Sequence, residues 1–246
     1  LTGVETAATT VVAPEPDELI EIGQEYFLAL RGDPASQTSL LSTTIQASML
    51  LRRMMDPRLG HPSHGAYGSR VFVFTDNLDL VNRLHSQLED AEGWKPGGVG
   101  LKPAGSLANL RAPGQSDDRA RESAGQLWAF ADGSLGTLSQ QMRIGRTSSA
   151  DSGVNTEDDI TVATAALEVG FDDARVGGIV QHKAPRNAAQ FLQRRGRAGR
   201  DPFMRPWSFV ILSGYGRDRL AFQSYETLFD PVVPPSTLPL NNRTVL

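Results

Sequence analysis

Basic residues are concentrated in one short stretch of the sequence, between Lys183 and Arg205. The stretch contains a single acidic residue, Asp201. Its seven basic residues are Lys183, Arg186, Arg194, Arg195, Arg197, Arg200 and Arg205. Arginine dominates, and a guanidinium group is suited to bidentate recognition of phosphate oxygens. The stretch therefore indicates contact with a phosphate group, although a run of charge can also be only a solvated, salt-bridged helix end.

The spacing within QRRGRAGR, at residues 193–200, favours the first of these two interpretations. Gly196 and Gly199 alternate with Arg197 and Arg200, and glycine allows both a sharp turn after a helix and a close approach of the backbone. Two arginines three residues apart can then converge on one anion. An arginine delivered from a neighbouring domain can stabilise the negative charge of a phosphoryl group during its transfer.

The overall composition limits the possible partners and chemistry. The 246-residue chain has 24 basic and 28 acidic residues, so its net charge is −4 and no global positive field indicates a nucleic-acid partner. It has no cysteine, which excludes disulfides, thiolate zinc sites and cysteine nucleophiles. His61 and His64 lie in a stretch with proline and glycine and have no further ligands nearby in the sequence. We interpret that stretch as a solvated loop and predict no metal site.

The ends and hydropathy of the chain bear on its location. No apolar run approaches the ~20 residues needed to span a bilayer, and the N-terminus lacks the pattern of a signal peptide. We therefore expect a cytoplasmic protein with no membrane partner. Because the chain starts at Leu1 and not at methionine, we expect it to be part of a longer protein.

The first part of the chain, residues 1–68, is expected to be a lead-in of two helices and a linker. The first helix is predicted over about 14–31, where apolar residues have near-helical spacing. The second is predicted after Ser36, which could cap it, and ends before Pro57.

The alternation of strands and helices in residues 69–215 predicts an α/β fold around a mainly parallel sheet. An apolar strand at 71–74 is followed by a helix that Asp76 or Asn77 could cap. Further strands are expected at about 140–147, 159–165, 177–182 and 207–212, and further helices at about 118–130 and with Pro185 in the first turn. Residues 93–118, rich in glycine and proline, are expected to be an inserted loop. Residues 216–246 are expected to form a helix and a proline-rich extended tail.

Three segments together resemble the second, RecA-like motor domain of superfamily 2 helicases. QRRGRAGR at 193–200 resembles motif VI, VATAALEVGFD at 162–172 resembles motif V, and FVFTDNLDLVNRL at 72–84 is similar to the motif IV region. In this order they cover most of residues 69–215, and they are specific only together. The form of motifs V and VI looks closest to Lhr-like helicases and to helicases of bacterial antiphage systems such as DISARM, which suggests a role in phage defence.

The resemblance implies an ATP site with Mg²⁺, shared with a first RecA-like domain. Arg197 and Arg200 would be catalytic arginine fingers that reach the γ-phosphate. Gly170 and Asp172 would lie beside the nucleotide, with Asp172 at the ribose or orienting a finger, unless it pairs with Arg175. Gln193, also in motif VI, would help to link ATP to the interface between the two domains.

The resemblance also implies contacts with a nucleic-acid backbone, with DNA favoured over RNA. Thr164 would make such a contact at the end of its strand, unless it only caps. Thr75 and Asn77 could bind phosphate through backbone amides. The family's backbone-binding turn would be replaced by Arg146, Thr147 and Ser148, and the cluster of basic residues adds Lys183.

Two features depart from the family pattern. Only about ten residues separate Ser149 from Ile160, where related domains usually have a helix. The insertion at 93–118 has no counterpart that we can name; it and the proline-rich tail could be docking surfaces or only tolerated additions.

Half of an ATP site is missing from the sequence. No lysine follows a glycine, so the chain has no Gly-Lys-Ser/Thr phosphate loop. Its only Asp-Glu pair, Asp17-Glu18, does not end an apolar strand and is therefore not a magnesium-binding motif. We expect the missing first motor domain, and other subunits of a larger complex, to be partners.

The sequence thus predicts the second motor domain of an ATP-dependent helicase or translocase. One alternative is a catalytically silent scaffold that binds nucleic acid or a protein. Another is a double-strand translocase that does not unwind. A free-standing small-molecule enzyme is disfavoured, because the sequence shows no convergent acid, base or nucleophile.

Overall fold

The described residues fold around one six-stranded sheet in which every pair of neighbouring strands is parallel. The computed structural model describes residues 24–32, 39–97, 99–102, 105–114, 116–124, 126–128, 138, 140–148, 153–164, 167 and 171–230. The strands are β1 Tyr26–Arg31, β2 Arg70–Phe74, β3 Ile144–Thr147, β4 Ile160–Ala163, β5 Val176–His182 and β6 Trp207–Leu212, in the order β1-β6-β5-β2-β4-β3. The predicted α/β class with a mainly parallel sheet is therefore confirmed.

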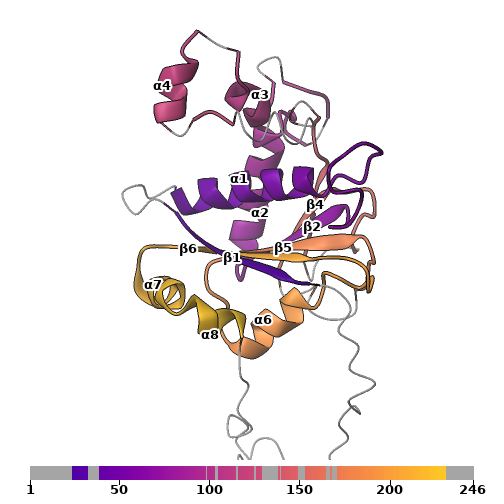
Figure 1. Cartoon of the computed structure of the whole chain (residues 1–246), viewed down its shortest axis with the longest axis vertical. Coiled ribbons are helices and arrows are strands. Elements are labelled where there is room, and N and C mark those ends of the chain that lie inside the picture. Colours follow the sequence, from indigo (N-terminus) through magenta and orange to yellow (C-terminus); the bar gives the residue numbers. More distant parts are fainter. Residues whose placement is uncertain are drawn as a thin grey trace, which may run out of the picture.

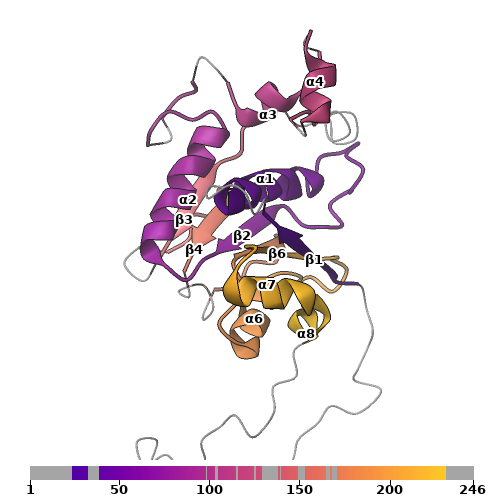
Figure 2. The same ribbon diagram turned by 90° about the vertical axis from the view of Figure 1, so that its left-hand side faces the viewer.

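The helices form a layer on each face of the sheet (Figures 1 and 2). α1 (Ser39–Met54) and α2 (Leu78–Ala91) cover one face. α6 (Ala188–Arg195), α7 (Gly216–Gln223) and α8 (Tyr225–Phe229) lie on the other face. The short helices α3 (Leu107–Arg111) and α4 (Asp118–Ser123) lie beyond α1 and α2 (Figure 1). Because both faces are covered, β2, β4 and β5 are buried along their whole length.

The strand β1 corrects the helix predicted over 14–31, as far as residues 24–31 are described. Phe27 and Ala29 pack toward the α6–α8 face, whereas Leu30 packs toward α1. This alternation is that of a strand, and the ring of Tyr26 stacks on Trp207 of β6 at 4.5 Å between ring centres. β1 and α1 lie within the predicted lead-in, but β1 pairs in the same sheet as the later strands and α1 packs into the same core.

Other element boundaries also differ from the predictions. The helix predicted at 118–130 ends at Ser123, and residues 126–128 are irregular. The segment predicted as an inserted loop at 93–118 contains the short helix α3. The Ser106 side chain caps this helix by accepting a hydrogen bond from the Asn109 N–H. Pro185 precedes α6, whose cap is Asn187. The last predicted helix is divided at Ser224 into α7 and α8. Ser36, the predicted cap of the second helix, lies outside the described residues.

An ion pair with both side chains fully buried ties α1 to the end of α2. Nη1 and Nη2 of Arg53 donate to Oε1 and Oε2 of Glu92 at 2.7 and 2.8 Å, and both side chains are 0% exposed. Arg53 also donates to the carbonyl oxygens of Met49 and Gln140, and Glu92 accepts from the N–H of Met142. The pair therefore holds together α1, the end of α2 and the segment that leads into β3.

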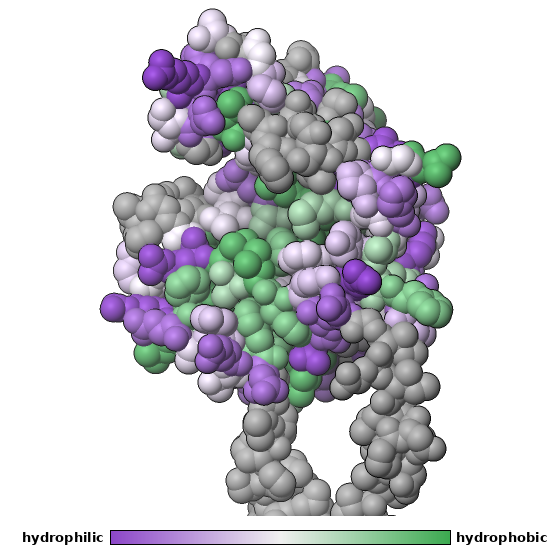
Figure 3. All heavy atoms as spheres, viewed as in Figure 1, coloured by the Kyte–Doolittle hydropathy of each residue, from purple (hydrophilic) through white to green (hydrophobic). Residues whose placement is uncertain are grey.

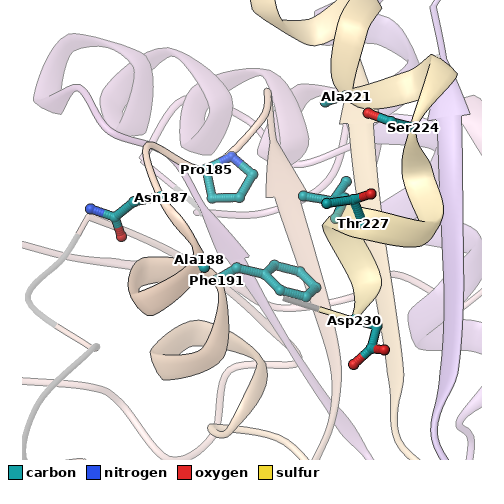
Figure 4. A pocket seen from close by; sticks show the side chains of 9 residues that line it. Pro185, Asn187, Ala188, Phe191, Ala221, Ser224, Thr227 and Asp230 are labelled. Atoms are coloured by element: carbon teal, nitrogen blue, oxygen red, sulfur yellow. The ribbon is translucent and has the colours of Figure 1, made fainter. Parts of the chain in front are cut away.

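The face with α6–α8 carries a cavity and an apolar surface. A cavity of about 350 Å³ is lined by residues of α6, α7 and α8, with Phe191 and Thr227 on opposite sides of it (Figure 4). Figure 3 shows the side of the molecule at which β1 lies, and apolar residues are clustered in the middle of this surface. Leu28 on β1 is 38% exposed. Within the described ranges, no helix combines the length and the apolar character that crossing a membrane requires.

A buried histidine links α1 to the end of β5. Nδ1 of His182 lies 2.7 Å from the Thr44 hydroxyl oxygen, and this hydroxyl donates to the carbonyl oxygen of Leu40. The hydroxyl oxygen must then accept from Nδ1–H of His182, which fits a neutral imidazole. Burial lowers the pKa of His182 to about 4, with a further lowering from Lys183 and an opposing effect of Asp218.

The low pKa of His182 predicts a loss of stability in mild acid. The unfolded chain binds a proton near the ordinary pKa of 6.5, whereas the folded chain does so only near 4. The contribution of His182 to the free energy of unfolding should therefore be constant well above pH 6.5 and fall by on the order of 3 kcal/mol as the pH drops from 6.5 to 4. Urea unfolding across this range would measure the slope. In His182→Asn the slope should become much shallower, and an unchanged slope would contradict the assignment.

Candidate nucleotide and nucleic-acid sites

The predicted site residues lie at two opposite edges of the sheet. In a parallel sheet all carboxyl ends of strands share one edge, and Thr75, Thr164 and Lys183 directly follow β2, β4 and β5 there. The segment after α6 lies at the other edge, because the N–H of Gly199 donates to the carbonyl oxygen of Val176, the first residue of β5. The predicted backbone contacts are thus separated from the predicted fingers by the length of the strands.

Helix α6 connects the two edges. It begins at Asn187, whose side chain accepts from the N–H of Gln190 at 2.8 Å. It buries Phe191 and Arg194 against the sheet. It ends at Gly196, whose N–H donates to the carbonyl oxygen of Leu192 at 2.9 Å. α6 therefore carries the chain back from the carboxyl edge to the turn that holds Arg197 and Arg200.

The turn after α6 requires glycine at one position. Gly199 has a φ of +72°, and a Cβ there would lie 2.6 Å from Cγ of Pro206. Both the left-handed backbone and the lack of space favour glycine. Gly196 has an ordinary φ of −65°. The sharp turn predicted from the glycine spacing is therefore found at Gly199.

The two finger candidates have different surroundings. Nε of Arg200 lies 3.2 Å from Oδ1 of Asp172, and these side chains are 44% and 70% exposed. Nη1 of Arg197 donates to the carbonyl oxygen of Phe171 at 2.6 Å. Arg197 and Arg200 therefore each contact one of the two residues that end the predicted motif V. The Arg200 guanidinium is oriented by the carboxylate of Asp172 and is exposed to solvent, so an external anion can bind to it.

The alternative pairing of Asp172 with Arg175 is not found. Nε of Arg175 donates instead to Oδ1 of Asp173 at 3.1 Å, and Arg70 donates to Oδ2 of the same carboxylate at 2.5 Å. Burial raises the pKa of Asp173, but the hydrogen bonds from Arg175 and Arg70 outweigh it and hold this pKa at about 2. Asp173 thus stays ionised and anchors the segment next to Asp172, a role that the sequence did not predict. Gly170 lies outside the described residues.

At the carboxyl edge, burial separates the predicted nucleic-acid contacts into two groups. The Thr75 side chain is 1% exposed, and its N–H donates to the carbonyl oxygen of Ala163, so this amide is not available to a phosphate. Thr147 and Ser148 are also buried. Thr164 is half-buried, and its carbonyl oxygen accepts from the N–H of Leu167.

The other candidates are exposed. Asn77 caps α2 by accepting from the N–H of Asp79 at 2.8 Å, which confirms one of the two predicted caps. Nη1 of Arg146 donates to Oδ1 of Asn82 at 2.5 Å. Lys183 has a φ of +69°, and its N–H donates to the carbonyl oxygen of Ile211, so its backbone is fixed while its side chain is exposed. Gln193, a candidate for the nucleotide site, is exposed on α6.

The sequence did not predict one network of contacts, which lies near candidates for both the nucleotide site and the nucleic-acid site. Arg194 is 1% exposed and donates to Asp76 and Gln181, both at 2.6 Å. From the sequence, Asp76 was only a possible helix cap and Arg194 only one of seven basic residues. A signal was available, because Arg194 lies three residues after Phe191 and therefore on the same, buried face of α6.

The comparison with protein families identifies the region that holds the predicted fingers. Residues 131–202 match the model of the helicase conserved C-terminal domain. The match includes the segments that resemble motifs V and VI, and it confirms the resemblance to the C-terminal RecA-like domain of superfamily 2 helicases. The motif IV region at 72–84 precedes the match.

Solved structures of helicases are similar at low identity. The Lhr helicase of Mycobacterium smegmatis bound to ssDNA and AMP-PNP is 16% identical, with a TM-score of 0.42, covering 77% of this chain and 19% of that one. S. cerevisiae Dbp5 bound to RNA and ADP BeF3 is 11% identical, with a TM-score of 0.45, and the match covers 91% of this chain and 43% of that one. The helicase MrfA bound to DNA and AMPPNP is 15% identical, with a TM-score of 0.45, and the match covers 83% of this chain and 22% of that one. The chain thus spans about a fifth of the Lhr chain and less than half of the Dbp5 chain. Among curated proteins, none matches the chain.

Proposed function

We propose that this chain is the second motor domain of an ATP-dependent superfamily 2 helicase or translocase, with Arg197 and Arg200 as its arginine fingers. The observation that carries the proposal is Arg200, which pairs with Asp172 and is 44% exposed on a turn fixed by Gly199. An exposed guanidinium held in place by a carboxylate is suited to stabilising charge on a phosphoryl group bound by another domain.

The nucleotide would be ATP with Mg²⁺, bound between this domain and a first RecA-like domain. ATP would supply the phosphoanhydride bond whose hydrolysis drives the motor. The donor set fits this ligand, because the exposed guanidinium of Arg200 can donate to phosphate oxygens. Gly170, Asp172 and Gln193 would lie near the nucleotide. Mg²⁺ would be shared with the first RecA-like domain.

A nucleic-acid strand would cross the carboxyl edge of the sheet. Thr164, Asn77, Arg146 and Lys183 are the candidates for contacts to its backbone, since all four are at least partly exposed. Such contacts carry little sequence information and depend strongly on salt. We propose DNA as the preferred strand, and other subunits as further partners. The resemblance to antiphage helicases supports a role in phage defence, which plaque counts on hosts with and without the gene would test.

ATP turnover of the intact protein, measured with and without DNA or RNA, tests the proposed function. We expect stimulation by nucleic acid that weakens steeply between about 50 and 200 mM salt. A protein with no turnover under any of these conditions would favour the silent scaffold. Strand displacement measured beside triplex displacement then separates a helicase from a double-strand translocase, because the translocase is active only in the triplex assay.

A further inference from the structure

The turn after β6 presents a tyrosine at the carboxyl edge of the sheet. Tyr215 is 69% exposed and directly precedes α7, and its neighbour Gly216 has a φ of +52°. The turn is short, because only Ser213 and Gly214 separate Tyr215 from the end of β6. The Ser213 hydroxyl donates to the carbonyl oxygen of Tyr215 at 3.4 Å. An aromatic ring is therefore exposed to solvent close to this edge.

A buried carboxylate fixes this turn to the loop after β5. Asp218 on α7 is 6% exposed. Its Oδ1 accepts from the N–H of Ala184 at 3.0 Å, and its Oδ2 accepts from the N–H of Ser213 at 2.9 Å. The neighbouring Arg217 donates to the carbonyl oxygen of Ala184 at 2.6 Å. The loops after β5 and β6 are therefore held together by two consecutive residues of α7.

The order of the strands places Tyr215 next to the proposed contacts with nucleic acid. The strands β3, β4, β2, β5 and β6 are neighbours in this order. Each has an exposed or half-buried candidate near or after its carboxyl end, and in the same order these are Arg146, Thr164, Asn77, Lys183 and Tyr215. Neighbouring strands lie about 4.8 Å apart, so β6 continues the row by one such step beyond β5.

Tyr215 differs in chemistry from the other four candidates. Those carry amide, hydroxyl or positively charged groups, which suit the phosphate–sugar backbone. A phenol ring is a flat surface on which a nucleobase can stack, and such stacking requires a base that is not already stacked and paired within a duplex. Aromatic rings beside positive charges are typical of sites that bind single strands. A ring beside Lys183 therefore favours an unpaired strand.

We propose that Tyr215 stacks on a base of an unpaired nucleic-acid strand and that Lys183 contacts the backbone beside that base. The inference rests on the proposed function and deepens it, because it names a single strand as the substrate of this edge. Lys183 has a φ of +69°, a conformation that residues other than glycine adopt mainly where the position is functional. Since Asp218 already fixes both loops, little backbone order has to be gained on binding.

Binding of the intact protein to two dye-labelled strands tests the stacking. One strand is an oligothymidylate, and the other has the same phosphate–sugar backbone with abasic sites in place of the bases. Tyr215→Ala should weaken binding to the oligothymidylate about tenfold and change binding to the abasic strand less than about twofold. Tyr215→Phe should bind both strands as wild type does, because the ring is kept. Fluorescence anisotropy would measure these dissociation constants.

Lys183→Gln separates the backbone contact from the stacking. Loss of the ammonium group should weaken binding to both strands alike, and the slope of log Kd against log salt concentration should fall by about 0.7. In Tyr215→Ala this slope should equal that of wild type, because no phosphate contact is lost. A reduced slope in Tyr215→Ala would contradict the stacking role.

The control is Tyr225→Ala, which removes a tyrosine ring that is 49% exposed on α8 and follows α7 in the chain. It should bind both strands as wild type does. If Tyr215→Ala loses affinity equally for both strands, or for neither, the stacking is overturned while the proposed function stands. A wild-type protein without nucleic-acid-stimulated ATP turnover would overturn the proposed function, and the stacking with it.

Discussion

Replacement of Arg200 by alanine is expected to lower nucleic-acid-stimulated ATP turnover of the intact protein about a thousandfold or more. The proposed role of this guanidinium is to stabilise charge that develops only during phosphoryl transfer. Its removal should therefore reduce kcat and leave nucleotide binding largely unchanged. Steady-state turnover combined with binding of a fluorescent ATP analogue would measure both quantities.

The matched control for this variant is Arg205→Ala. Arg205 is exposed in the same basic stretch and is not a finger candidate, and its N–H donates to the carbonyl oxygen of Ala66 regardless of side chain. Arg205→Ala should keep turnover within a few fold of wild type. Equal turnover in wild type and Arg200→Ala would show that the finger assignment is wrong. Equal losses in both variants would indicate a general effect of positive charge.

The second large effect is expected from Glu92→Gln. This change leaves the fully buried guanidinium of Arg53 without its counter-charge, so the free energy of unfolding should fall by about 3–5 kcal/mol. Urea denaturation of the chain would measure the loss.

The control for Glu92→Gln is Asp90→Asn, which breaks the exposed pair with Lys102 at the same end of α2. The Asp90 side chain is 70% exposed, and such pairs contribute less than about 1 kcal/mol. If Glu92→Gln were as mild as Asp90→Asn, the ion pair would not be essential to the packing of α1 on α2.

The buried strands could be predicted from the sequence because most of their side chains are apolar. β2 was expected at 71–74 and runs from Arg70 to Phe74, and β6 was expected and found at 207–212. In such strands the local composition already reports the environment, since both faces of the sheet are covered.

β1 could not be predicted from local pattern. Tyr26, Phe27 and Leu30 fit a helical spacing as well as an edge strand, and only pairing with the distant β6 decides between them. The division of the last helix at Ser224 was also invisible, since GRDRLAFQSYETLF has no glycine or proline inside it.

The site shows the same division between local and distant information. The proximity of Asp172 to Arg200 was among the possibilities that the family resemblance implied, and the structure places these two side chains 3.2 Å apart. The pairing of Asp76 with Arg194 joins residues more than a hundred positions apart, and no motif contains both. Such contacts depend on which strands become neighbours, which spacing along the sequence does not record.

The pairing of β1 with β6 also has a consequence for the biosynthesis of the domain. Tyr26 lies opposite Trp207, so the first described strand of the chain pairs with the last. A ribosome releases β1 long before β6 has been synthesised. Until then, the backbone groups and apolar side chains of β1 that contact β6 in the folded domain remain unpaired. This side of the nascent sheet can close only after Leu212 has emerged, and until then YFLALR is a segment that chaperones can recognise.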